Sequence, residues 1–119
     1  MDVVTVFQLK NLLRYAAIGW TIAIFIGCAL PSDQIGIDLS GRDKLIHTAI
    51  FLIFGLLWRL LGYGFGRVLL AGLLYGFALE IYQGVMPINR SFELADGLAD
   101  TVGTLLGLVL AEGWFRLKK

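Results

Sequence analysis

Four long apolar stretches dominate the sequence and constrain its fold more than any other feature. The first runs from Tyr15 to Leu30 without a charged residue, and the second runs from Leu45 to Trp58. The third begins at Val68, and the fourth ends near Trp114. A helix needs about 20 residues to cross roughly 30 Å of hydrocarbon, because each residue advances about 1.5 Å. We therefore predict four transmembrane helices.

The composition supports a membrane protein and excludes an ordinary soluble domain. Of the 119 residues, 58% are hydrophobic and 16% are charged, and the mean hydropathy is +0.80. Soluble domains carry about 25% charged residues and fewer than half apolar ones. The net charge of +1 gives no reason to expect nucleic acid as a partner, and the single cysteine excludes an internal disulfide.

We predict an all-α fold, a four-helix transmembrane bundle that forms one membrane domain over residues 1–119. The expected helices cover about residues 12–31, 41–62, 67–86 and 93–114.

The third and fourth helices are short of apolar residues. Only twelve uncharged residues separate Arg67 from Glu80, and eleven separate Asp100 from Glu112. Neither stretch can span the membrane unless its helix carries an acidic residue below the membrane surface. We therefore expect Glu80 and Asp100 to lie inside the membrane, offset by partners such as Lys44, His47 or Arg90 or by neutralisation, because a lipid-facing charge is costly.

The basic residues predict the orientation of the bundle, because cytoplasmic loops are enriched in lysine and arginine. Seven basic residues fall at one end of the predicted helices: Lys10, Arg14, Arg59, Arg67, Arg116, Lys118 and Lys119. Three fall at the other end: Arg42, Lys44 and Arg90. Both termini should therefore be cytoplasmic.

Three smaller features accompany this topology. Trp58 and Trp114 lie near predicted helix ends, where tryptophan anchors helices at the membrane interface. The run ending at Cys28 faintly resembles a lipoprotein signal, but Phe25 is atypical three positions before the cysteine, so we expect Cys28 to be a small buried residue. The Gly72/Gly76 and Gly103/Gly107 pairs should allow close helix packing.

In this topology most of the polar residues come to one level, just inside the outer surface. They are Asp43, Lys44, His47, Glu80, Gln83, Asn89, Arg90, Glu93, Asp96 and Asp100. The spacing is three or four residues between Asp43 and His47, between Glu80 and Gln83, and between Asp96 and Asp100, so each of these pairs shares one helix face. We predict a layered polar pocket that opens outward.

Each of these residues also has a structural explanation. Asp43 follows Ser40 at the spacing of a capping box, and an acidic Glu93 would favour the start of the fourth helix. His47 could serve only as an interhelical hydrogen-bonding residue, a role worth around 1 kcal/mol in membranes. Lys44 could extend its ammonium group to the interface, and Arg90 could be a simple loop charge.

Three segments resemble, in order and spacing, the signature of VanZ-like membrane proteins. They are DKLIH (Asp43 to His47), EIYQGVMPINRSF (Glu80 to Phe92) and DGLADTVGTLLG (Asp96 to Gly107), and they cover about residues 40–110. The resemblance marks Asp43, Lys44, His47, Glu80, Gln83, Arg90 and Asp96 as site residues. In this chain Asp100 stands where the family usually has asparagine, and Asn89 stands where it often has glycine.

The resemblance implies a small protein of the bacterial inner membrane, as many members of the family are, and the family's namesake is associated with low-level teicoplanin resistance. We expect membrane lipids as partners and a site that engages a lipid headgroup or a cell-envelope precursor. As catalytic residues we predict His47 as general acid or base, oriented by Asp43, with Glu80 and Asp96 as a second acid or base or a cation site. Lys44, Gln83, Arg90 and Asp100 would bind the headgroup. We expect no cofactor, and the convergence of carboxylates with a histidine leaves a divalent metal open.

A non-catalytic alternative remains. The chain could be an accessory subunit of a larger membrane protein assembly, with the polar residues holding the bundle together. A transporter or channel is less well supported, because polar groups at one end of four short helices provide no path across the membrane.

Overall fold

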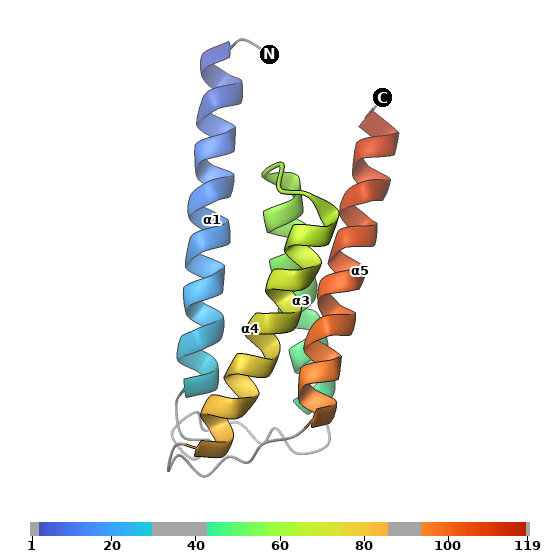
Figure 1. Ribbon diagram of the computed structural model, residues 1–119. Helices are drawn as coiled ribbons and strands as arrows, with labels where there is room; N and C mark the ends of the chain where they lie inside the picture. The colour runs from blue at the N-terminus through green and yellow to red at the C-terminus, as the bar shows by residue number, and fades with distance from the viewer. Residues whose placement is uncertain (1–2, 30–42, 86–93, 119) are drawn as a thin grey trace.

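The computed structural model describes residues 3–29, 43–85 and 94–118, which form four α-helices (Figure 1). They are α1 (Val3–Ala29), α3 (Asp43–Leu60), α4 (Phe65–Val85) and α5 (Leu94–Lys118). Both ends of the chain lie at the end of the bundle that carries the short turn between α3 and α4. The all-helical prediction is confirmed, whereas the side of the membrane on which the termini lie stays a prediction.

Three of the described helices are long and apolar enough to cross a membrane: Gln8–Cys28, Phe65–Val85 and Leu94–Leu117. α3 is not among them, since its eighteen residues include Asp43, Lys44 and Arg59. Large apolar side chains such as Leu74 and Val109 are more than half exposed on the outer faces of the helices. Because lipid replaces water there, this exposure is expected for a membrane bundle.

The helices extend further at the terminal end than the sequence predicted. α1 begins at Val3 rather than near residue 12, and α5 continues to Lys118 rather than ending near residue 114. Neither extension contains a proline or a turn-forming pair that would end a helix. Lys10 and Arg14 therefore mark a change in polarity along a continuous helix and not its first turn.

Glycines bring α5 into close contact with its neighbours on two sides. A side chain at Gly103 or Gly107 would meet the backbone carbonyl of Thr48 or Leu52 on α3. On the other side, a Cβ atom at Gly76 of α4 would lie 2.7 Å from Cβ of Asp100. The Gly72/Gly76 pair of α4 thus faces α5, and the Gly103/Gly107 pair of α5 faces α3. α5 therefore packs between α3 and α4.

α1 is held to the other helices by aromatic side chains with polar tips. Trp20 Nε1 donates to the carbonyl of Ile50 on α3 at 2.8 Å, and Trp58 Nε1 donates to Thr21 Oγ1 at 2.9 Å. The Tyr75 hydroxyl of α4 donates to the Thr21 carbonyl at 2.6 Å. Trp58 therefore connects α3 to α1, whereas Trp114 is 55% exposed, and the interfacial position of both residues stays a prediction.

We predict that Gly107→Ala destabilises the bundle, because the added methyl group must displace backbone atoms of α3. The expected loss is about 1 to 3 kcal/mol, which is typical of overpacking. Gly19→Ala is the matched control, since no atom lies within 4 Å of a Cβ atom built there. Thermal unfolding of the two variants in detergent measures the difference, and equal midpoints would contradict the close packing of α5 on α3.

Candidate functional site

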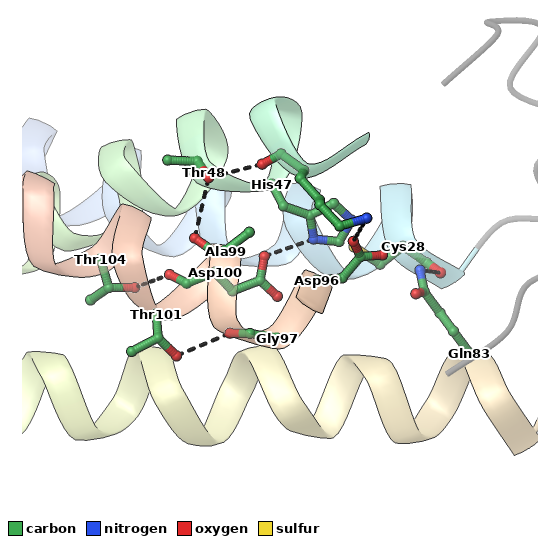
Figure 2. A network of polar contacts seen from close by, with 11 residues as sticks. Cys28, His47, Thr48, Gln83, Asp96, Gly97, Ala99, Asp100, Thr101 and Thr104 are labelled. Atoms are coloured by element: carbon green, nitrogen blue, oxygen red, sulfur yellow. Dashed lines mark hydrogen bonds and ion pairs between the residues drawn. The ribbon is translucent and has the colours of Figure 1, made fainter. Parts of the chain in front are cut away.

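A histidine and an aspartate from two helices form the shortest described polar contact in the buried part of the polar layer. His47 of α3 is 4% exposed, and its Nδ1 lies 2.7 Å from Oδ1 of Asp100 on α5, which is fully buried (Figure 2). An ionised carboxylate can only accept hydrogen bonds, so Nδ1 donates whenever Asp100 is charged. Nε2 of a neutral His47 then carries the lone pair and can take up a proton or bind a ligand.

Glu80 of α4 brings a third buried group to this pair. The side chain is 0% exposed, and one of its carboxylate oxygens lies within 4.8 Å of ligand atoms of both His47 and Asp100. We refer to His47, Glu80 and Asp100 as the polar cluster. Its members come from three helices, so their convergence depends on the packing of the whole bundle.

The close packing of α4 and α5 brings Asp100 to the level of Glu80. Gly76 stands one turn before Glu80 on α4 and faces the Asp100 side chain. Any larger residue at position 76 would push α5 away from α4. Thr104, also fully buried, donates from Oγ1 to the Asp100 carbonyl at 2.9 Å, which satisfies its hydroxyl within α5. Small residues and locally bonded hydroxyls therefore surround the buried acid.

Two further predicted site residues lie toward the α5 start. Asp96 is buried, and its Oδ1 lies 3.7 Å from Nζ of Lys44, whose side chain is 57% exposed. Asp96 stands one turn before Asp100 on the same face of α5, as the sequence predicts. Lys44 therefore supplies a positive charge at the rim of the site, within reach of a ligand that approaches the polar cluster.

Gln83 has a structural contact. It is 2% exposed, and its Nε2 donates to the carbonyl of Cys28 at 3.0 Å, away from the polar cluster (Figure 2). This bond connects α4 to the last turn of α1, where backbone carbonyls lack a helical partner. Cys28 is buried, as predicted from the sequence.

Two predicted site residues cannot be placed with the cluster. The Asp43 side chain and Arg90 lie outside the described residues, although the backbone of Asp43 begins α3. We predicted Asp43 as the group that orients His47, and the structure gives Asp100 a direct contact with the same ring. The catalytic and binding roles of all eight predicted residues stay predictions.

The polar cluster has a donor set that suits a divalent metal ion. One imidazole nitrogen and two carboxylate oxygens are common ligands of Zn²⁺, and imidazole also suits iron. Ligand atoms bound at about 2.1 Å around such an ion lie roughly 3 to 4 Å apart. The cluster atoms, all within 4.8 Å of one another, would therefore need only small side-chain movements to bind a metal ion.

A comparison with protein families identifies the chain. The model of the VanZ/LLP1 family matches residues 8–116, which include most of α1 and nearly all of α5. The chain belongs to the VanZ/LLP1 family. Neither the search of curated proteins nor that of solved structures found a match. The family match extends the resemblance beyond the three polar motifs to parts of all four described helices of this VanZ-like protein.

Sequence reasoning missed several residues that position the site. Arg59 Nε donates to Glu112 Oε1 at 2.7 Å and connects α3 to α5 at the end opposite the cluster. Thr48 donates to the Lys44 carbonyl at 2.8 Å. The Arg59–Glu112 pair was detectable in principle, because opposite charges near the ends of α3 and α5 fall at one level when these two helices are drawn parallel.

We predict an energetic coupling between His47 and Asp100. In a double-mutant cycle with His47→Ala and Asp100→Ala, the coupling should be roughly 1 to 2 kcal/mol, as for strong interhelical hydrogen bonds in membranes. Asp100→Asn should lose less, because its amide oxygen still accepts from Nδ1. Unfolding of the four proteins in detergent gives the coupling, and strictly additive losses would show that the contact contributes nothing.

Proposed function

We propose that this VanZ-like membrane protein engages a lipid headgroup or a cell-envelope precursor through the polar cluster. This proposal rests on the buried His47–Asp100 contact of 2.7 Å, with an oxygen of Glu80 close to both residues. A group of this kind, buried and built from three helices, is typical of sites that transfer protons or bind ions. Lipid-embedded polar residues are rare because they are costly, so their concentration at one point supports a function.

Each residue of the site has a role in this proposal. His47 acts as general acid or base through Nε2, while Asp100 holds the ring and stabilises its charged form. Glu80 acts as a second acid or base or as a ligand for a cation. Lys44, at the rim beside Asp96, attracts the anionic part of the headgroup or precursor.

The site opens to the outer face of the bacterial inner membrane in this proposal. The distribution of basic residues supports this orientation, with seven at the end that carries the termini and three at the end that carries the cluster. Envelope precursors and the glycopeptide teicoplanin, to which the family's namesake confers low-level resistance, meet at this face of the membrane.

The activity test uses teicoplanin susceptibility of a sensitive bacterium that expresses the chain. The wild-type protein should raise the inhibitory concentration, and His47→Ala and Glu80→Gln should abolish the increase at equal protein levels in the membrane. Gly19→Ala, which changes a position with open space around it, should retain the effect. Retained resistance in both cluster variants would refute a direct role of the cluster.

The same variants distinguish the alternative function, an accessory subunit of a larger membrane assembly. Such a subunit should tolerate His47→Ala and Glu80→Gln singly, since the glycine contacts that hold α5 against α3 and α4 remain. It should lose its assembly when Gly103 is enlarged to leucine, because the side chain would separate α5 from α3. Co-purification of partner proteins with each variant measures assembly.

The orientation is tested by cysteine labelling from outside intact cells. Lys44→Cys places a thiol on an exposed side chain beside the cluster, and Gly64→Cys places one in the turn at the opposite end. An impermeant maleimide should label position 44 in intact cells and position 64 only after permeabilisation. Native Cys28 is buried and gives the background. The reverse pattern would place the cluster on the cytoplasmic side.

A further inference from the structure

A second site lies at the opposite end of the bundle, between α1, α3 and α4. It is a groove of about 390 Å³, and its walls include the rings of Phe54, Trp58, Tyr63 and Tyr75. Ligand sites are commonly concave, mainly apolar and of roughly 300 to 1,000 Å³. Nothing in the polar cluster contributes to it.

The polar tips of the aromatic residues are turned away from any ligand in this groove. The indole N–H of Trp58 donates to Thr21 Oγ1, and the hydroxyl of Tyr75 donates to the Thr21 carbonyl. Thr21 Oγ1 in turn donates to the carbonyl of Ala17 at 2.8 Å. Because these groups satisfy one another, the groove wall presents ring faces and aliphatic carbons. Its chemistry suits a hydrocarbon chain and not a polar metabolite.

Positive charges surround the terminal end of the groove. Arg67 lines the groove itself, and Lys10 and Arg14 line an adjoining depression of about 190 Å³ that shares Tyr63 with it. All three basic side chains belong to exposed residues. Arg14 contacts the neutral Asn11 at 3.5 Å, and among the described residues no carboxylate lies within 4.0 Å of these three cations.

The fourth cation of this region is already neutralised. Arg59 pairs with Glu112 at 2.7 Å, and its guanidinium carbon lies 4.8 Å from the ring centre of Phe115 on α5. Arg59 also donates from Nη1 to the carbonyl of Tyr63 at 3.2 Å, so its guanidinium group is already bonded within the protein. The charge available to a ligand comes from Lys10, Arg14 and Arg67.

We propose that this groove binds one acyl chain of an anionic phospholipid, with the lipid phosphate held by Lys10, Arg14 and Arg67. The basic residues lie at the terminal end of the groove, where the phosphate would bind, and the apolar walls extend toward the middle of the bundle, where the acyl chain would lie. From Arg67 to Tyr75 the groove follows α4 for eight residues, or about 12 Å, toward the middle of the bundle. Basic pockets between transmembrane helices bind anionic headgroups in this way.

Simple interfacial anchoring explains less of the structure. Basic residues near helix ends are attracted to any anionic surface and need no groove beside them. Here three cations from two helices lie beside an aromatic groove, and the rings of Trp58 and Tyr63 pack edge to face in its wall, with their centres 5.5 Å apart. The arrangement predicts both a headgroup preference and a dependence on the shape of the groove.

Trp58 provides the readout, because it lines the groove. The full-length protein is reconstituted in phosphatidylcholine vesicles that contain increasing fractions of brominated phosphatidylglycerol or brominated phosphatidylcholine. Quenching in the wild type minus quenching in Trp58→Phe gives the signal of the groove. We expect the anionic lipid to quench at a clearly lower fraction than the zwitterionic one, since each nearby cation contributes roughly fivefold in affinity.

Two sets of variants separate charge from shape. The triple variant Lys10→Ala, Arg14→Ala, Arg67→Ala should reduce the preference for phosphatidylglycerol at least about tenfold. Arg116→Ala, which removes an exposed charge on α5, is the control. Ala71→Phe should fill the groove and lower quenching by both lipids, while Ala78→Phe, at an exposed α4 position outside the groove lining, should leave it unchanged.

Equal quenching by the two lipids in the wild type would overturn the proposal, as would a triple variant that keeps the preference. An Ala71→Phe protein that behaves like Ala78→Phe would exclude the groove as the binding site. The groove is also excluded as a lipid site if neither lipid quenches Trp58 and cross-linking shows that a second copy of the chain covers the groove. His47→Ala should retain the lipid preference. Loss of lipid binding in the groove and loss of the function proposed for the polar cluster are therefore measured separately.

Discussion

The close approach of α5 to both α3 and α4 is the constraint on which the rest of the structure depends. Gly103 and Gly107 bring its backbone against α3, and Gly76 receives the Asp100 side chain from the α4 side. Only this double contact brings an acid of α5 within 2.7 Å of His47 and close to Glu80. In a bilayer, where apolar surface gives no net driving force between helices, such packing and the polar contacts it permits are what hold helices together.

The two ends of the bundle place their charged residues in different surroundings. At the end of the polar cluster, buried carboxylates must be offset, and a histidine and a lysine lie beside two of them. At the terminal end, cations lie beside an apolar groove in which the polar tips of Trp58 and Tyr75 both donate to Thr21. The proposed function rests on the first arrangement, and the proposed lipid site rests on the second. α4 contributes to both, with Glu80 near one end and Arg67 at the other.

Much of the fold could be predicted from the sequence, because the length of an apolar run and the position of charges follow directly from the thickness of a membrane. The four helices and the inward direction of Glu80 and Gln83 follow from this constraint, and both side chains are indeed buried. The start of α1 was predicted about nine residues too late, since polarity does not end a helix that has no breaker. The position of Trp58 near a helix end is visible in the sequence, whereas its bond to Thr21 depends on how α3 packs against α1.

For the site, the sequence by itself determined which residue types occur at the level of the polar layer and, through helical periodicity, which of them share a face of one helix. Asp96 with Asp100 and Glu80 with Gln83 are of this kind. Only the tertiary structure decided which residues meet across helices: His47 contacts Asp100, Lys44 contacts Asp96, and Gln83 bonds to the end of α1 instead of joining the cluster. Periodicity gives the direction of a side chain within a helix, whereas rotation and spacing between helices arise from the packing of glycines and side chains over the whole bundle.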